Sequence, residues 1–352
     1  MSTPAQTESH LEDDEVVLRV AGFEEAREVK LWAHLAIPLE RDFERVADED
    51  VWVLRQPRPD LDRLEYLIEV TDGDGHDHLG PHPDNPRRVS SAFGDHSWLP
   101  MPGYAAPAWL EEPGIAHHVE HWGLEGTPVG EIDARVWSPA DAGPHDDLPL
   151  LVVHDGPEMA DLAGLTRYAE ALMADGRLPR MRIALLPPGP ERNARYGANP
   201  DYAPALAEAV AILRHRWPST APPVGMGASL GALSMLHTQW TVPGTFGGLW
   251  LASGSYFTPT TDPQERDFAQ WDAITAFTEE LLEAESLPDL GEIALVCGTA
   301  EENLANNGLV LAALRRGGVP ATWGTVRDGH NYTCWRDLFD PHLTDLLRRT
   351  WR

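Results

Sequence analysis

The sequence predicts an α/β domain, with a mostly parallel sheet wrapped by helices, preceded by a small all-β sandwich. From about residue 130 onward, strand-like and helix-like segments alternate strictly, which is typical of a parallel sheet covered by helices. Between residues 16 and 70 the apolar runs are short and separated by turn-like segments, as in an antiparallel sandwich. A glycine-flanked serine, Ser229, also stands between a predicted strand and a predicted helix.

Length and charge limit the function classes. A chain of 352 residues is long enough for two domains with separate cores. Its 56 acidic and 27 basic side chains give a formal charge of -29, which would repel phosphate backbones and anionic membranes. We therefore expect neither nucleic acid nor a membrane as partner. Without a long apolar stretch or a signal-like N-terminus, we expect a cytoplasmic protein, with Cys297 and Cys334 as reduced thiols.

The N-terminal part has the pattern of an antiparallel β domain. Residues 1–14 are polar and acidic, and we expect them to be a disordered leader. We assign residues 15–113 to the β-sandwich and a linker. Its predicted strands are 16–20, 29–33, 51–54 and 64–70. Residues 72–113 are rich in Pro, His and Gly, so we expect an irregular crossing segment there.

Histidines around the predicted domain boundary suggest metal binding as an alternative. They are His76, His78, His82, His117, His118 and His121. No cysteine accompanies them, and no His-Glu-x-x-His motif is present. We predict no metal site and no cofactor.

Residues 114–352 are predicted to form the α/β domain. Its expected strands are 131–137, 148–154, 182–186, 248–252, 293–297 and 321–326, in addition to a short strand before Ser229. Its expected helices are 165–174, 202–216, 271–285, 309–316 and a closing helix from residue 338.

The segment from Gly227 to Gly231 reads Gly-Ala-Ser-Leu-Gly, the pattern of a nucleophile elbow. A serine on a sharp strand-to-helix turn has a strained backbone, and the residues two before and two after it must be small. Gly227 and Gly231 meet this need. The elbow predicts an α/β-hydrolase fold with Ser229 as nucleophile and the Leu230 N–H as an oxyanion donor.

A serine elbow requires an acid and a base, which follow it on loops after later strands. Glu301 and Glu302 lie on the loop that follows the predicted strand 293–297, and His330 lies on the loop after the strand 321–326. We predict that His330 is the general base and that Glu301 orients it. Glu302 and Asp328 stay open as alternative acids. The second oxyanion donor is expected near Gly156, after the strand 148–154.

These motifs together resemble the enterochelin esterase-like branch of the "Putative esterase" family in the α/β-hydrolase superfamily. The matching marks are His154-Asp155-Gly156, the elbow, Ser253-Gly254-Ser255, Gly298-Thr299-Ala300-Glu301 and Gly329-His330 followed by Trp335-Arg336. Upstream, Asp84-Asn85-Pro86 and residues 93–97 look like the segment by which this family links an N-terminal immunoglobulin-like domain to the hydrolase.

The resemblance implies a serine esterase that opens a trilactone siderophore such as enterochelin, often in its ferric form, so that iron is released. The partner would be a small-molecule ester. A catecholate complex carries high negative charge, and local arginines would offset the charge of the protein. We therefore predict Arg192, Arg195, Trp335 and Arg336 as substrate-binding residues.

Two other functions fit the same residues. The triad could transfer the acyl group to an alcohol instead of water. Alternatively, the chain could be a catalytically silent binding scaffold whose β-sandwich recognises its partner. The presence of elbow, acid and base favours an enzyme.

Overall fold

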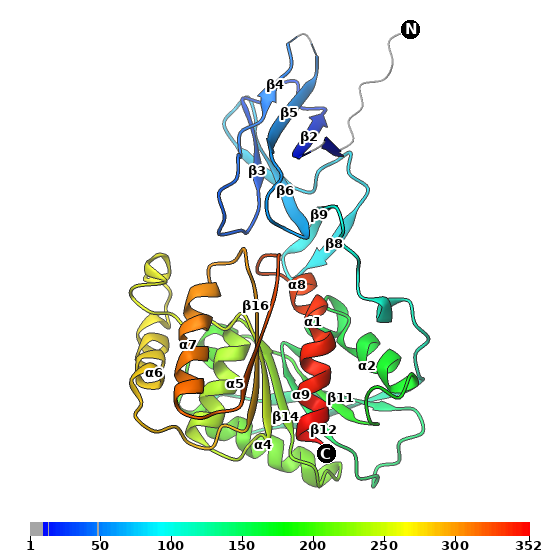
Figure 1. Ribbon diagram of the computed structural model, residues 1–352, viewed down its shortest axis with the longest axis vertical. Coiled ribbons are helices and arrows are strands. Elements are labelled where there is room, and N and C mark those ends of the chain that lie inside the picture. Colours follow the sequence, from blue (N-terminus) through cyan, green and yellow to red (C-terminus); the bar gives the residue numbers. More distant parts are fainter. Residues whose placement is uncertain (1–9, 13, 48) are drawn as a thin grey trace. The chain divides into compact units, whose positions relative to one another are not determined.

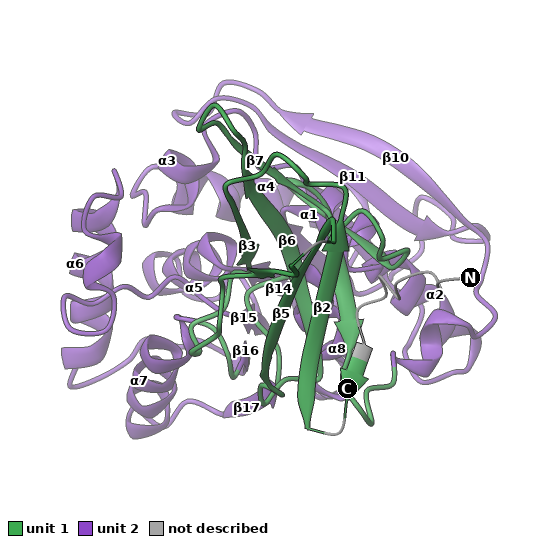
Figure 2. Ribbon diagram, turned by 90° about the horizontal axis from the view of Figure 1, so that it is seen from above, with its two compact units in different colours: residues 1–105, 299–301, 327–331 green, residues 106–298, 302–326, 332–352 purple. Residues whose placement is uncertain are grey.

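The computed structural model describes residues 10–12, 14–47 and 49–352 (Figure 1). These residues separate into two compact units (Figure 2). Unit 1 holds the chain up to Ala105 together with the short segments Thr299–Glu301 and Arg327–Asn331. Unit 2 holds the remainder, beginning at Ala106. The boundary predicted between residues 113 and 114 therefore lies inside unit 2.

Unit 1 contains two antiparallel sheets that share one apolar core. The first has the order β1-β2-β5-β4, and the second has the order β3-β6-β9-β8, with β7 also paired to β6. The strands are β1 (His10–Glu12), β2 (Glu15–Ala21), β3 (Glu28–Trp32), β4 (Glu44–Arg45), β5 (Val51–Pro57), β6 (Arg63–Thr71), β7 (Asp77–Gly80), β8 (Arg88–Ser91) and β9 (Gly94–Pro100). This arrangement confirms the predicted β-sandwich.

Alternation along the strands explains the core of unit 1. Successive strand residues point to opposite faces of a sheet, so Val16 and Leu18 of β2 enter the same core. Tyr66 and Ile68 of β6 enter it from the other sheet. All four are at most 2% exposed, and their burial supplies the main driving force for packing the two sheets together.

Two expectations about the N-terminal part are wrong. The irregular segment expected from residue 72 contains β7, β8 and β9, because β9 pairs with β6 and buries Leu99 in the core. The disordered leader expected over residues 1–14 includes β1, whose Leu11 pairs with Val16 and packs on the core. Residues 1–9 and 13 of that leader lie outside the described residues.

Unit 2 is built on an eight-stranded sheet with the order β10-β11-β13-β12-β14-β15-β16-β17. Its last six strands in this order are parallel to one another, while β10 and β11 pair antiparallel at one edge. The strands are β10 (His117–Leu124), β11 (Ile132–Pro139), β12 (Leu150–His154), β13 (Arg182–Leu186), β14 (Val224–Ala228), β15 (Gly248–Ala252), β16 (Glu292–Gly298) and β17 (Ala321–Val326).

Helices cover both faces of this sheet (Figure 1). One apolar core joins the sheet to α3 (Arg192–Tyr196), α4 (Tyr202–Arg216), α5 (Leu230–Thr241), α6 (Trp271–Glu283) and α7 (Leu304–Arg316). The other joins it to α1 (Gly156–Asp161), α2 (Leu165–Ala174), α8 (Tyr332–Asp337) and α9 (Thr344–Thr350). Neighbouring strand residues such as Leu150 and Leu151 enter opposite cores. Because both faces are covered, these strands are continuous apolar runs.

The predicted fold class is confirmed: a mostly parallel sheet wrapped by helices follows a β domain. The closing helix predicted from residue 338 is wrong in its bounds. Helix α8 ends at Asp337, a π-helical turn spans Phe339–Leu343, and α9 begins at Thr344. Pro341 lies inside that turn and lacks the N–H that a regular helix would use there. In the described part of the chain, no helix has the length and apolar character needed to cross a membrane.

Candidate active site

Ser229 stands on a sharp turn between β14 and α5. Its backbone has φ 55° and ψ −128°, a region that residues other than glycine adopt at a cost of about 1–3 kcal/mol. The Ser229 N–H donates to the Ala252 carbonyl of the next strand at 2.9 Å, and its own carbonyl accepts from Ala232 at 3.0 Å. These contacts hold the strained turn in place, as a nucleophile elbow requires.

Both elbow glycines lie where a side chain would meet neighbouring atoms. A Cβ added to Gly227 would lie 2.4 Å from the carbonyl carbon of Gly231, closer than any real contact. A Cβ added to Gly231 would lie 3.2 Å from the Cβ of His154. The prediction that a larger residue would make the two arms of the turn collide is therefore confirmed for Gly227, whereas a larger residue at Gly231 would press on β12.

The two predicted oxyanion donors are first residues of helices. Leu230 begins α5, and Gly156 begins α1 directly after β12. The first N–H groups of a helix have no acceptor in a preceding turn, and the helix dipole makes them favourable to negative charge. Asp155 turns the chain into α1 with φ 48°. A Cβ on Gly156 would lie 2.3 Å from the Leu185 Cα, so the loop packs directly on β13. Oxyanion binding by these groups stays a prediction.

The segment after β15 surrounds the nucleophile on one side. The Ser255 hydroxyl lies 3.2 Å from the Ser229 hydroxyl, within hydrogen-bond distance. Ser253 has φ 47° and accepts a 3.0 Å hydrogen bond from the Trp335 indole. Trp335 is 6% exposed, so its indole supports this turn, and its predicted contact with substrate stays untested. Ser255 was not predicted as a neighbour of Ser229, although Ser253-Gly254-Ser255 stood out as a motif.

The predicted acid and base are hydrogen-bonded within unit 1. The Nδ1 atom of His330 lies 2.5 Å from Oε2 of Glu301. The Glu301 side chain is fully buried, and that of His330 is 15% exposed. A carboxylate can only accept in this bond, so Nδ1 carries the proton and Nε2 is the basic nitrogen of the neutral ring. The structure thus pairs His330 with Glu301, while the carboxylate of Asp328 bonds to Arg63 and Asn331.

Two connected loops carry this pair. Thr299–Glu301 follows β16 without a break, and Arg327–Asn331 follows β17 in the same way. The Ala300 N–H donates to the Asp328 carbonyl at 3.0 Å, which ties one loop to the other. Because β14, β16 and β17 are parallel, the elbow and both loops continue from the same edge of the sheet.

Arg192 binds the turn that precedes Gly156. Its Nε and Nη2 atoms donate to the two carboxylate oxygens of Asp155 at 2.8 and 2.7 Å. Burial lowers the pKa of Arg192, but this pairing raises it above its ordinary value. The guanidinium also lies 5.4 Å from the centre of the Tyr196 ring. The fork geometry orients Asp155, and the predicted contact of Arg192 with substrate stays a prediction.

The other two predicted arginines are also held by protein groups. Arg195 is 7% exposed and donates to the carbonyls of Val129 and Glu131. The Nε atom of Arg336 lies 2.8 Å from Asp337. These contacts give both guanidinium groups acceptors inside unit 2. Their predicted role in substrate binding is untested.

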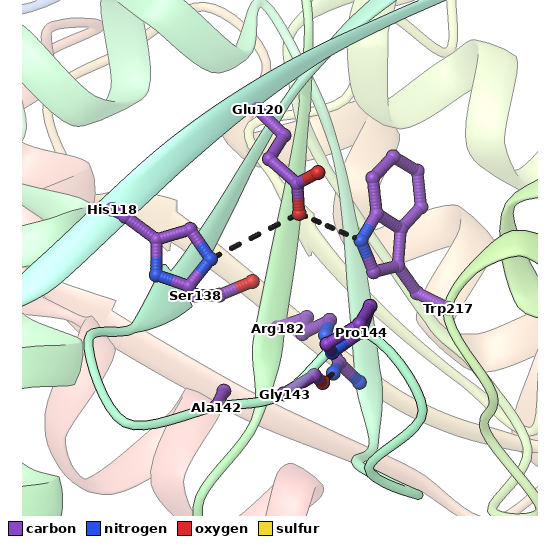
Figure 3. A pocket seen from close by; sticks show the side chains of 8 residues that line it. All are labelled: His118, Glu120, Ser138, Ala142, Gly143, Pro144, Arg182 and Trp217. Atoms are coloured by element: carbon purple, nitrogen blue, oxygen red, sulfur yellow. Dashed lines mark hydrogen bonds and ion pairs between the residues drawn. The ribbon is translucent and has the colours of Figure 1, made fainter.

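A polar cavity of about 240 Å³ lies in unit 2 (Figure 3). His118 and Glu120 of β10, Ser138 of β11 and Arg182 at the start of β13 line it. Arg182 begins a strand, so the cavity is at the amino-terminal edge of the parallel strands. The Trp217 indole donates to Glu120 at 3.0 Å across it. This cavity is separate from the predicted catalytic residues.

Two of the histidines that suggested metal binding are paired with carboxylates. His78 lies 3.0 Å from Asp72, and His117 lies 2.8 Å from Glu170. Across residues 10–12, 14–47 and 49–352, no group of three or more His, Cys, Asp or Glu side chains is arranged to hold a metal ion.

Comparison with known proteins gives a family and several similar structures. The family model described as "Putative esterase" matches residues 127–346. No curated protein sequence matches the chain. The match spans more than half of the chain, and its bounds include the elbow, Glu301 and His330.

Similar solved structures cover both units. The ferric enterobactin esterase of Salmonella typhimurium is 20% identical with a TM-score of 0.78, over 97% of this chain and 96% of that chain. The enterobactin esterase of Shigella flexneri is 22% identical with a TM-score of 0.76, over 97% and 95%. A ferulic acid esterase from Anaeromyces mucronatus is 15% identical with a TM-score of 0.50, over 70% and 96%. At these identities the likeness shows a shared fold.

Proposed function

The chain belongs to the "Putative esterase" family, and from this premise we propose that it is a serine esterase that forms an acyl-enzyme on Ser229. The observation that carries the proposal is the strained serine elbow together with the 2.5 Å bond between Glu301 and His330. Both features lower the stability of the fold. The elbow does so through backbone strain, and the acid–base pair does so through the burial of a carboxylate. A function that uses both features explains why they occur together.

The chemistry follows from which atoms carry protons. His330 holds a proton on Nδ1 toward Glu301, so Nε2 accepts the proton of the Ser229 hydroxyl as Oγ attacks the ester carbonyl carbon. The carbon–oxygen bond to the alcohol then breaks, and Nε2 returns the proton to the departing alkoxide. Water repeats the sequence on the acyl-enzyme and releases the acid. Glu301 stabilises the imidazolium that forms in both steps.

The negative charge that develops on the carbonyl oxygen during attack must be stabilised by hydrogen-bond donors. The N–H groups of Leu230 and Gly156 are proposed for this role because both begin helices at the carboxyl edge of the sheet. Removal of one such donor typically costs about 10²- to 10³-fold in kcat. Arg192 would act here through Asp155, which sets the turn into α1.

The proposed substrate is a trilactone siderophore of the enterobactin class. Support comes from the two enterobactin esterases, whose structures match this chain over nearly its whole length, the β domain included. The ferulic acid esterase matches a smaller share of this chain. A substrate that requires both domains is therefore favoured over a simple aryl ester.

The test compares the purified protein with Ser229→Ala on short-chain nitrophenyl esters and on ferric and iron-free enterobactin. Ser286→Ala, at an exposed serine, is the matched control. We expect Ser229→Ala to lose at least about 10³-fold in kcat, the control to keep full activity, and the trilactone to have the higher kcat/KM. Equal, background-level hydrolysis by all three proteins on every ester would contradict the proposal.

A further inference from the structure

Arg63, at the start of β6 in the β-sandwich, is a buried cation that pairs with Glu65 on its own strand and with two residues on the loop that carries His330. Its side chain is 2% exposed. Its Nε atom lies 2.8 Å from Oδ2 of Asp328, an ion pair without hydrogen-bond alignment. Its Nη2 atom donates to the Asn331 side-chain carbonyl at 2.7 Å. We infer that Arg63 is a positioning residue for the general base, an inference that rests on the proposed function.

The contacts of Arg63 reach both sides of His330. Asp328 Oδ1 accepts from the Gly329 N–H at 2.7 Å and from the Asn331 side-chain amide at 2.9 Å. Asp328, Gly329 and Asn331 therefore form one bonded group around the base, and Arg63 binds it at two points. A loop held before and after one residue has little freedom to rotate that residue.

Backbone packing limits the same loop from another direction. A Cβ added to Gly329 would lie 2.5 Å from the Leu35 side chain and 3.0 Å from the His34 carbonyl. The ring centres of His34 and His330 are 5.9 Å apart, in an edge-to-face arrangement. The base therefore depends on residues of the N-terminal β-sandwich for its place.

The cost of this arrangement argues for a function. The Asp328 side chain is also 2% exposed, and burying two charges costs several kcal/mol each before pairing offsets the loss. Burial lowers the pKa of Arg63, but Asp328 and Glu65 raise it above its ordinary value. The second carboxylate, Glu65, lies 3.0 Å from Arg63 Nη2 and 2.8 Å from His96 Nδ1. An apolar pair would serve stability alone at least as well.

If Arg63 holds the histidine loop, its loss should lower kcat even on small esters that have no need of the β-sandwich for binding. KM should change little, since the Arg63 side chain is buried and is not proposed to contact substrate. Misplacement of a base by a fraction of an ångström to 1 Å costs about 10- to 100-fold.

Variants of the full chain test this. Arg63→Met removes the charge and leaves Asp328 buried and unpaired, so that protein is expected to lose stability as well as activity. The double variant Arg63→Met with Asp328→Asn removes the charges of this pair and keeps similar shapes, while Glu65 keeps its contact with His96. We expect it to regain thermal stability toward that of the wild type while kcat on nitrophenyl butyrate stays about 10- to 100-fold low. Arg63→Lys should restore part of kcat, and Arg55→Met, at a half-exposed surface arginine, should match the wild type.

The results expected above would support a positioning role for Arg63. A folded double variant with wild-type kcat would overturn it, as would an unchanged kcat with a raised KM, which would assign Arg63 to substrate binding. The downfield proton signal of the His330 Nδ1–H bond provides a direct readout, and we expect it to weaken in both Met variants. If the wild type itself hydrolyses no ester, the proposed function is wrong. If the wild type is active and the Arg63 variants keep its kcat, only the positioning role of Arg63 is wrong.

Discussion

His330 Nδ1 and Glu301 Oε2 lie 2.5 Å apart, with the carboxylate fully buried. This bond decides which imidazole nitrogen acts as the base, because the proton on Nδ1 leaves the lone pair on Nε2. It connects two loops that follow neighbouring parallel strands. The acid and base are thus a preformed pair.

The first prediction concerns this acid. Glu301→Gln keeps the shape but cannot stabilise the imidazolium or hold the tautomer, so we expect kcat to fall by about 10²- to 10⁴-fold with little change in KM. Steady-state hydrolysis of nitrophenyl butyrate measures it. Glu302→Gln is the control and should stay within about threefold of the wild type. The reverse order of effects would make Glu302 the acid.

The second prediction concerns Gly227, whose added Cβ would lie 2.4 Å from the Gly231 backbone. Gly227→Ala should lower the free energy of unfolding by about 1–3 kcal/mol or more and reduce activity, since the elbow must open. Gly308→Ala is the matched control, because it lies inside α7 with open space around it. It should raise stability by roughly 0.5–1 kcal/mol. Urea unfolding curves measure both, and a neutral Gly227→Ala would refute the packing argument.

The third prediction concerns pH. His154 is fully buried at the end of β12, where Nδ1 donates to the Gly231 carbonyl at 3.0 Å and Nε2 accepts from the Tyr202 hydroxyl. Burial lowers the pKa of His154 to about 4. The unfolded chain, in which this pKa is about 6.5, binds more protons between pH 6.5 and 4. His154 therefore makes the folded state lose stability as pH falls through this window, by on the order of 3 kcal/mol in total.

Asp328 acts in the opposite direction over part of that range, because burial raises its pKa to about 6, against the effect of Arg63. The folded state then binds the additional proton between pH 6 and 4, which favours folding as pH falls. The measurement is therefore the difference between the wild type and His154→Phe. We expect the variant to lose the part of the pH slope that destabilises the wild type in acid. Parallel stability curves would show that His154 does not titrate in this window.

The fourth prediction separates two roles for Arg192. As the bidentate partner of Asp155, it should matter equally for every substrate, because it sets the turn before Gly156. Arg192→Lys should then reduce kcat about 10-fold on both nitrophenyl butyrate and enterobactin. A loss confined to the anionic siderophore would instead support the predicted substrate contact. Comparison of kcat/KM on the two substrates gives the answer.

Local sequence was sufficient for the elbow and for most of the sheet. Gly227, Ser229 and Gly231 are close in sequence, and their turn is determined by backbone sterics that any strand-to-helix serine shares. The strand predicted at 182–186 has the observed bounds, because both of its faces are buried and residues 183–186 are continuously apolar. Such signals depend on neighbours in the chain alone.

Long-range partners could not be predicted in this way. Arg63 and Asn331 are 268 positions apart, and no periodicity in either segment marks them as partners. Strand β9 was missed because it lies in a Pro- and His-rich stretch and is held by pairing with β6. Arg192 was predicted to bind substrate, and nothing in the sequence indicated its pairing with Asp155, 37 positions earlier. These features depend on tertiary contacts.

Covalent labelling of the nucleophile tests the central claim most directly. The protein is treated with an alkyl fluorophosphonate, and the adduct is counted by intact mass and located by peptide mapping. We predict one adduct per chain, on Ser229, absent from Ser229→Ala and formed much more slowly in His330→Ala. An unmodified protein, or an adduct on another residue that persists in Ser229→Ala, would contradict a serine esterase built on this elbow.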